Sequence, residues 1–555
     1  MSTIRNTDDT DLADAHGEYE IRVNPYYPFN PCSILLVLIF ASTVTFAQSD
    51  STKNKGFLSG SLQIEAQRYE EDKNLPFQTL ENQYGFNTYL QLNYQYKKFR
   101  IGVRGESYAP VLIGYPSNLK GVGLASRFVS YQGKKWGATL GNFYEQFGNG
   151  LILRAQEQRP LGMDTSIDGL KVAFTDKKYN FTAFTGKQRL SFRRTDGWLS
   201  GFNNSLIISN SSASYFLKIG GSIVNKNESY DGILTIIKPN VWAWSSRVDY
   251  AINTFSVQAE YAQKSPDASP ANRFITRTGR AFLLNADWFV GNLTTTLQLK
   301  RIENMDFRSQ RGEMLNNALI NYVPVGTKQQ TYRLLTLYPY ASQVLGEIGG
   351  QFDATYSLNN GSTLAFNASA MNGLKRYETN TDEGYTTKFF EVGEQKYYRN
   401  ASLEFDQQFT DNFHGTFVSD FTQFNREVIL GGRPEIVSAL TFIADGTWKL
   451  SKKHALHAEL QHLSTKQDLG NWAMALAEVS IAPHYFFYVS DEINYGDFNF
   501  TDVQHYYNIG TAYSLNANRI SLSYGRVREG LLCVGGICRI IPAYKGLSLS
   551  VMSSF

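Results

Sequence analysis

Apolar and polar residues alternate one by one through long stretches of the chain. In "FLLNADWFV" (282–290), every second residue from Phe282 to Val290 is apolar, while Asn285 and Asp287 lie on the opposite face. Gly291-Asn292 then predicts a two-residue hairpin turn, after which "LTTTLQLK" resumes the alternation. A period of two predicts antiparallel β-strands with one apolar and one polar face.

The same pattern predicts thirteen strands from residue 282 to the end of the chain. A soluble β-sandwich also alternates, but these runs span about 10–13 residues rather than the usual 5–6. We therefore predict an all-β fold, a transmembrane outer-membrane antiparallel β-barrel of about 24 strands (range about 20–26). The upstream strands are expected at 57–69, 84–96, 98–108, 125–132, 136–144, 168–175, 179–187, 213–224, 241–251 and 253–264, with a weaker one at 230–238.

Short and long connections alternate between the thirteen strands, and this predicts orientation. In outer-membrane barrels the short turns are periplasmic and the long loops are external. A last strand ending in Phe555 is similar to the C-terminal signal of such barrels. Tight turns are expected near 291–292, 359–362, 410–412, 451–453, 482–484 and 515–517, and outer loops near 302–347, 371–396, 425–436, 465–471, 495–503 and 529–541.

The N-terminal region predicts export. "CSILLVLIFASTVTFAQSD" (32–50) is an apolar run followed by a small-x-small site, which indicates a secretory signal cleaved between Ala47 and Gln48. Residues 1–31 carry six acids against two arginines, unlike a basic n-region, so the true start is expected further downstream. We assign 1–47 to an N-terminal extension and signal peptide, 48–56 to a short periplasmic N-terminus, and 57–555 to one barrel domain.

Composition supports the barrel and argues against nucleic acid. Tyr and Phe together number 34 + 37 = 71, Gly numbers 45, and Cys only 3. Beyond residue 47 the charge is (53 − 2) − (50 − 6) = +7. This excess is scattered rather than gathered in a basic stripe, so a nucleic-acid partner is not expected.

Charged residues on the polar strand faces are the first candidate site, because charges that line a lumen set the selectivity of channels. The alternative is that they solvate the interior and pair across strands. Glu404, Asp406 and Asp420 lie on adjacent strands and predict an acidic wall. The lumen-lining candidates are Asp287, Lys300, Asp353, Glu404, Asp406, Asp420, Asp445, Lys449, His457, Glu459 and Arg519.

Two long connections form the second candidate site. Residues 141–169 hold an apolar "LILR" among charges, which predicts a constriction folded into the lumen, with Arg154 and Arg159 facing acidic wall residues. An ordinary outer loop with an extra short strand is the alternative. The connection 302–347 is apolar and aromatic in part, which favours an ordered lid or inward plug. The constriction candidates are Glu145, Arg154, Glu157, Arg159, Asp164 and Asp168.

Cys533 and Cys538 flank Gly535-Gly536 in the last predicted outer loop. Two cysteines without a nearby histidine cannot complete a structural zinc site, and four intervening residues do not match a Cys-x-x-Cys redox motif. Glycines can adopt the positive φ values that fold one cysteine back on the other. We expect a disulfide that fixes the loop, with free buried thiols as the alternative and no metal site.

"GNFYEQFGNGLILRAQEQRPLGMDTSIDGLKV" and the closing "CVGGICRIIPAYKGLSLSVMSSF" resemble an uncharacterised outer-membrane β-barrel family of Bacteroidetes. The resemblance implies location in the Gram-negative outer membrane after Sec export, and it brings no established activity, cofactor or site residues.

The leading functional prediction is a porin-like channel that passes or exports a hydrophilic solute, in contact with outer-membrane lipid. The alternative is a scaffold or surface-binding component of an envelope assembly with a protein partner. A barrel-embedded hydrolase is less favoured, because the sequence has no G-x-S-x-G elbow and no His cluster with metal-ligand spacing. We therefore expect neither an enzyme nor a cofactor.

Overall fold

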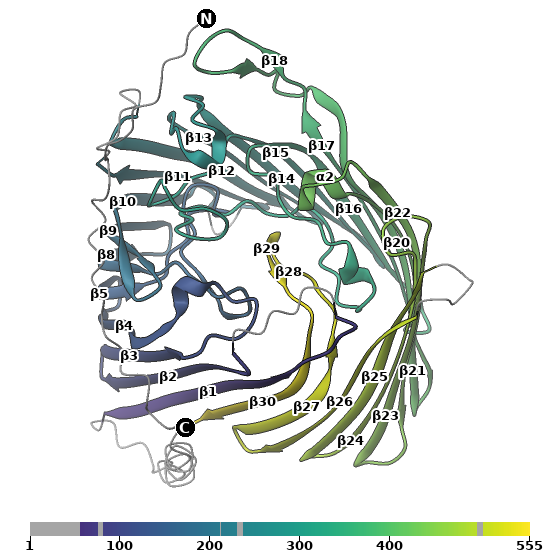
Figure 1. Ribbon diagram of the computed structural model, residues 1–555. Helices are drawn as coiled ribbons and strands as arrows, with labels where there is room; N and C mark the ends of the chain where they lie inside the picture. The colour runs from purple at the N-terminus through teal and green to yellow at the C-terminus, as the bar shows by residue number, and fades with distance from the viewer. Residues whose placement is uncertain (1–55, 76–81, 211–212, 230–236, 497–502) are drawn as a thin grey trace, which may run out of the picture. The chain divides into compact units, whose positions relative to one another are not determined.

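Twenty-four antiparallel strands form one closed ring in the computed structural model, within the unit Ser51–Phe555 (Figure 1). The structure describes residues 56–75, 82–210, 213–229, 237–496 and 503–555. The ring closes where the first and last strands pair, with Ala66 opposite Leu549. The backbones of Gly60 and Phe555 exchange two hydrogen bonds there, at 2.8 and 3.0 Å. A closed ring leaves no strand edge unpaired, as a membrane requires.

The ring strands are β1 (Phe57–Glu70), β2 (Tyr84–Tyr96), β3 (Phe99–Tyr108), β4 (Gly121–Gln132), β5 (Trp136–Phe143), β8 (Ile167–Thr175), β9 (Tyr179–Leu190), β10 (Arg193–Ile207), β11 (Tyr215–Asn227), β12 (Asn240–Ile252), β13 (Phe255–Lys264), β14 (Gly279–Val290), β15 (Leu293–Glu303), β16 (Gly346–Ser357), β17 (Thr363–Leu374), β20 (Val392–Thr410), β21 (Phe413–Asn425), β22 (Ile436–Lys449), β23 (His454–Thr465), β24 (Asn471–Ile481), β25 (Tyr485–Gly496), β26 (Gln504–Leu515), β27 (Asn518–Val527) and β30 (Tyr544–Ser554).

Short elements lie in the connections: β6 (Glu157–Gln158), β7 (Met163–Asp164), β18 (Tyr377–Glu378), β19 (Tyr385–Thr386), β28 (Gly530–Val534), β29 (Ile537–Ile541), the helix α2 (Arg426–Leu430), and the 3-10 turns η1 (Ser117–Leu119), η2 (Arg159–Leu161), η3 (Pro270–Asn272) and η4 (Leu335–Leu337). No helix in the described ranges is long and apolar enough to cross a membrane.

The predicted fold class and strand number are confirmed, but one ring strand was not predicted. The thirteen strands from β14 onward match the predicted ones. Upstream, β10 has no predicted counterpart, and 230–238 was counted in its place. Residues 230–236 lie outside the described residues, and β11 pairs directly with β12, so the ring has no strand between them.

The two ends of the ring differ in the length of their connections. At one end, called the turn end, connections run from two residues (97–98) to seven (208–214). Here Gly291 takes a φ of +57° between β14 and β15, which is why a glycine suits the predicted two-residue turn. At the other end, called the loop end, most connections are longer, and the longest is 304–345.

The outer face of the ring is apolar, as the alternation predicts. Leu140, Trp288 and Leu460 are 64%, 57% and 62% exposed. Exposed apolar side chains recur on strands around the ring, whereas water-soluble proteins rarely expose a large apolar patch. An apolar outer band of this kind is typical of barrels that contact lipid.

Buried apolar side chains lie on the inner face near the loop end. Among them, Leu199, Val224 and Ile302 are fully buried. They pack in one hydrophobic cluster with Ile152 and Phe307 from two connections. The loop-end half of the ring is therefore filled by the chain's own loops, which Figure 1 shows inside the barrel.

Candidate functional site

Residues 304–345, the lumen segment, span the interior from wall to wall. Gln188 of β9 donates to the carbonyl oxygen of Leu319 at 2.7 Å. Further along, the backbone N–H of Leu334 donates to Gln461 of β23 at 2.8 Å. β9 is the seventh and β23 the nineteenth strand of the 24-strand ring, so they are twelve strands, half the ring, apart. The lumen segment thus crosses the barrel as an inward plug.

Carboxylates line the inner face of one side of the ring. The predicted Glu404, Asp406 and Asp420 stand on β20 and β21, with Asp406 opposite Thr416 and Ser402 opposite Asp420. Neighbouring strands extend the row beyond the predicted group. The acidic wall, as we name it, consists of Glu404, Asp406, Asp420, Asp445, Glu459, Glu478 and Glu492 on β20 to β25.

Cations of the lumen segment meet this wall. Lys328 Nζ lies 2.9 Å from a carboxylate oxygen of Glu404, and Arg333 Nε lies 2.8 Å from Glu492. Lys328 and Glu404 are 30% and 32% exposed, so the pair remains partly in water. These two ion pairs attach the centre of the lumen segment to β20 and β25.

Tyr332 lies between Lys328 and Arg333 in the sequence and makes a further contact with the acidic wall. Its hydroxyl donates to Asp445 at 3.4 Å. Burial raises the pKa of the Tyr332 hydroxyl, and the neighbouring charge of Asp445 raises it further. The hydroxyl therefore stays protonated and acts as a donor at neutral pH.

His457 joins three strands of the wall. Its Nε2 lies 3.1 Å from Asp445 and its Nδ1 lies 2.7 Å from Glu478. Asp445, His457 and Glu459 each offer one ligand atom, and these atoms lie within 4.8 Å of one another. Oxygen and imidazole ligands at that spacing can coordinate a divalent cation.

The other predicted lining residues also lie on inner strand faces, with local partners. Asp287 accepts hydrogen bonds from Ser256 and Thr296, and Asp353 from Gln351 and Asn367. Arg519 lies over the Phe486 ring at 5.8 Å, and Lys449 is exposed where β22 meets its turn.

Lys300 departs from the prediction, because it is buried under the lumen segment. Its Nζ lies 2.7 Å from Glu347. It also donates to the carbonyl oxygens of Pro324 and Val325 at 2.8 and 2.5 Å. The ammonium group thus fixes the lumen segment to the wall and does not line open space.

Residues 144–166, the constriction loop, lie inside the ring. Leu151, Ile152 and Leu153 are fully buried. The backbone N–H of Arg154 donates to Ile320 at 2.8 Å, which attaches the constriction loop to the lumen segment. The apolar "LILR" noted in the sequence is therefore part of a core.

The charges of the constriction loop do not meet the acidic wall. Arg154 stacks on Tyr322 at 4.0 Å, while Arg159 stacks on Tyr89 at 4.6 Å and pairs with Glu157 at 2.8 Å. These partners differ from the predicted ones because the loop joins β5 and β8, far around the ring from β20–β25. Of the remaining candidates, Glu145 pairs with Lys171 at 3.2 Å.

Asp164 forms the centre of a buried ion cluster with Arg104 and Arg189. Burial alone would raise the pKa of this carboxyl, but the two guanidinium charges outweigh burial and hold its pKa below its usual value. Glu106 also pairs with both arginines, at 2.8 and 2.5 Å. The cluster joins the constriction loop to β3 and β9.

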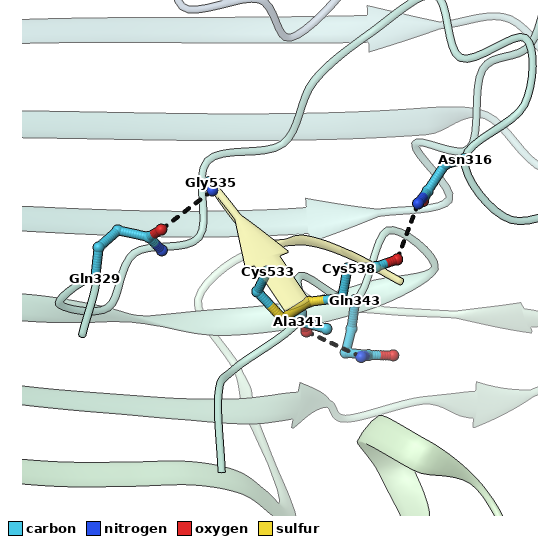
Figure 2. Close-up of a disulfide and its surroundings, with 7 residues drawn as sticks. All are labelled: Asn316, Gln329, Ala341, Gln343, Cys533, Gly535 and Cys538. Carbon is cyan, nitrogen blue, oxygen red and sulfur yellow. Dashed lines mark hydrogen bonds between the residues drawn. A yellow bond between two sulfur atoms is a disulfide. The ribbon is translucent and has the colours of Figure 1, made fainter. Parts of the chain in front are cut away.

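Residues 528–543, the mouth hairpin, contain β28, β29 and a disulfide between Cys533 and Cys538 (Figure 2). Gly535 and Gly536 take φ values of +58° and +83° at its tip. Figure 2 shows two hydrogen bonds to the lumen segment: Asn316 donates to the carbonyl of Cys538 at 2.9 Å, and the N–H of Gly535 donates to Gln329 at 3.2 Å. The hairpin therefore packs against the lumen segment.

Sequence reasoning missed Lys328, Arg333, Glu478 and Glu492. Glu478 was not recognised as inward-facing because the apolar Met474 and Leu476 precede it on the same inner face of β24. The inner and outer faces of this strand therefore differ little in polarity. A signal was available: apolar residues at inner positions near strand ends indicate loops packed inside. No local pattern marks the two cations, because their partners are remote in sequence.

Comparison with known proteins gives a family and architectural likenesses. The model of a family of unknown function, DUF6029, matches residues 31–555. The P pilus usher PapC translocation pore aligns with a TM-score of 0.42 and 10% identity over 90% of this chain and 99% of that chain. The siderophore receptor PirA from Pseudomonas aeruginosa aligns with a TM-score of 0.42 and 9% identity, over 91% and 81%. No curated protein matches the chain.

The copper transporter OprC also aligns, with a TM-score of 0.40 and 10% identity over 92% of this chain and 83% of that chain. The family match agrees with the predicted resemblance to a barrel family without an established activity. The assignment to Bacteroidetes stays a prediction.

Proposed function

The chain belongs to the family of unknown function DUF6029, and we propose that it is an outer-membrane channel, gated from within, for a cationic hydrophilic solute. One observation carries this proposal: Lys328 and Arg333 of the lumen segment occupy the acidic wall at Glu404 and Glu492. An acidic lining favours cations. A cationic solute can therefore take the place that the segment's own cations hold.

The apolar outer face supports placement in the outer membrane. Because short turns are periplasmic in such barrels and long loops external, we assign the loop end to the cell surface. The lumen segment, constriction loop and mouth hairpin then close the barrel from outside. The solute would reach the acidic wall only after part of this closure moves.

The part that moves is the stretch 328–333, whose residues are half-buried or exposed. Its contacts include ion pairs and hydrogen bonds to side chains of the wall, which contribute little each and exchange readily with water or solute. The preceding stretch, 305–323, is held by fully buried Met305, Phe307 and Ile320. Opening by displacement of 328–333 alone leaves that core intact.

Planar bilayer recording of the purified protein in a KCl gradient tests the proposal. We expect discrete openings and a reversal potential that shows at least about threefold preference for K⁺ over Cl⁻. The variant E404Q/D406N/D420N should lose most of that preference. D353N is the control, because Asp353 lies on β16, outside the acidic wall.

A scaffold is the second candidate, favoured by the bonds that join three loops inside the ring, such as that of Asn316 to Cys538. It predicts no openings under any voltage or cation, together with reproducible co-purification of another envelope protein. That outcome would refute the channel.

A further inference from the structure

Four charged side chains gather on the lipid-facing side of the ring. Asp168 stands directly opposite Lys187, and Lys187 directly opposite Trp198. Residues directly opposite one another on antiparallel strands point to the same face, and Trp198 is 46% exposed on the outer face. Asp168 therefore departs from the prediction that it belongs to a constriction: it points outward.

Two arginines complete this outer cluster. Arg194 pairs with Asp168, and Arg127 Nη2 lies 3.6 Å from the same carboxylate. Arg127 and Arg194 are 55% and 50% exposed, whereas Asp168 is 13% exposed. The acid is thus covered, and the two guanidinium groups face the surroundings. With Lys187, the four charged residues carry a net charge of 3 − 1 = +2.

An apolar hollow adjoins the charges. Its volume is about 520 Å³, and the outward Ile101, Val103, Val129 and Leu140 line it together with the four charged residues. Charged side chains on the outer face of a barrel are costly in the bilayer midplane and tolerated near the interface. The hollow therefore offers an apolar floor with cations at one edge.

The cluster stands at the height of lipid headgroups. Lys187 lies eight residues from the start of β9, which is about 20 Å from the turn end at about 3.3 Å per residue and a tilt of about 40°. An apolar band of about 25 Å places Lys187 close to the loop-end interface. Trp198 beside it is an interfacial residue type.

We propose that this outer cluster binds the phosphorylated headgroup of a lipid in the loop-end leaflet, with an acyl chain in the adjoining hollow. In a Gram-negative outer membrane that lipid is lipid A. Guanidinium groups bind phosphate oxygens with paired hydrogen bonds, and the apolar hollow suits a hydrocarbon chain. The inference rests on the proposed membrane location and is independent of transport.

Native mass spectrometry of the detergent-purified protein tests the site with two probes, lipid A and the same lipid A after removal of its phosphates. We expect the wild-type protein to bind the phosphorylated form at least about tenfold more tightly, because only that form uses the cations. Equal binding of the two forms would overturn the proposal. This comparison needs no variant, so a folding defect cannot confuse it.

Charge variants locate the effect on the surface. R127Q/K187Q/R194Q should abolish the preference for phosphate. K98Q/K134Q/K177Q is the matched control, because it removes the same charge at exposed positions of the turn end. Loss of preference in the control alone, or in both variants equally, would refute the site. Capture of an acidic protein by the same cations, without lipid binding, would also refute it.

Discussion

The lumen segment consists of two stretches that are held in opposite ways. Over 305–323, Met305, Phe307 and Ile320 are fully buried in one core. Over 328–333, Lys328 and Arg333 are 30% and 44% exposed and make ion pairs with the wall. One connection therefore contains a stretch anchored in a core and a stretch held by polar contacts. The gate that we propose needs both.

The difference has a simple energetic basis. A fully buried apolar side chain contributes about 1.5–3 kcal/mol by leaving water, and its neighbours cannot close the gap if it moves. An exposed ion pair contributes about 0–1 kcal/mol. Movement should therefore begin at 328–333. Four variants follow in order of decreasing loss of unfolding free energy: the first and the last test this contrast directly, and the other two test contacts that hold the neighbouring loops.

Ile320→Asp should have the largest effect, because it places a carboxylate without a partner in the anchoring core. We expect a loss of more than about 3 kcal/mol in unfolding free energy and rapid proteolysis of the lumen segment. Leu315→Asp, in the same segment but at an 84% exposed position, should leave both unchanged. Chemical unfolding measures the unfolding free energy of the two variants, and timed trypsin digestion measures how fast the lumen segment is cleaved. Equal values for the two variants would contradict the claim that Ile320 anchors the segment.

Asp164→Asn should cost about 2–3 kcal/mol at pH 7, because it leaves Arg104 and Arg189 with Glu106 as their remaining shared acid. The pKa of Asp164 is lowered on folding, so its contribution is complete above its unfolded value of about 3.9 and is lost as pH falls through the folded value. Wild type should therefore keep this contribution from pH 7 to pH 5 and lose it below about pH 4. The variant should lack that acid step in a series of unfolding curves.

Cys533→Ser/Cys538→Ser should cost at most about 2 kcal/mol, because the closed loop is short. The hairpin keeps its backbone pairing and its bonds to Asn316 and Gln329. Mass spectrometry without reduction should show the disulfide in the wild-type protein. Two free thiols would contradict it. Melting with and without reductant measures the cost.

Lys328→Gln/Arg333→Gln should cost least, under about 1 kcal/mol, yet it should change conductance most. Glu492 keeps Arg528 as a partner, so the wall remains intact while 328–333 is released. We expect openings about tenfold more frequent, a factor equal to about 1.4 kcal/mol in the closed-to-open balance. Arg433→Gln/Lys466→Gln, which removes two exposed loop-end cations, is the control. Unchanged opening frequency in the first variant would contradict the releasable part.

The alternation of apolar and polar residues predicted most of the ring, because each strand of a membrane barrel has one face toward lipid and one toward the interior. It failed at β10, where a register shift between Arg194 and Trp198 interrupts the period and Asn203 and Asn204 blur the two faces. The apolar 230–238 was counted instead. Local pattern alone could not recognise a strand whose period is interrupted by a register shift.

The candidate site was predictable on the wall and not in the plug. Glu404, Asp406 and Asp420 follow from strand parity, which a sequence displays. The partners Lys328 and Arg333 follow from the path of a long connection through a ring whose closure joins β1 to β30. Their sequence separation from Glu404 and Glu492, 76 and 159 residues, explains why no local rule finds them.

The constriction loop, the lumen segment and the mouth hairpin all enter from the same end of the ring, while connections at the other end have two to seven residues, as 97–98 and 208–214 show. The two entrances of the proposed channel therefore differ. A cation driven from the turn end would meet carboxylates first, and one driven from the loop end would meet the closure first. Currents of equal driving force but opposite sign should differ in size, so the molecule should behave as a rectifier.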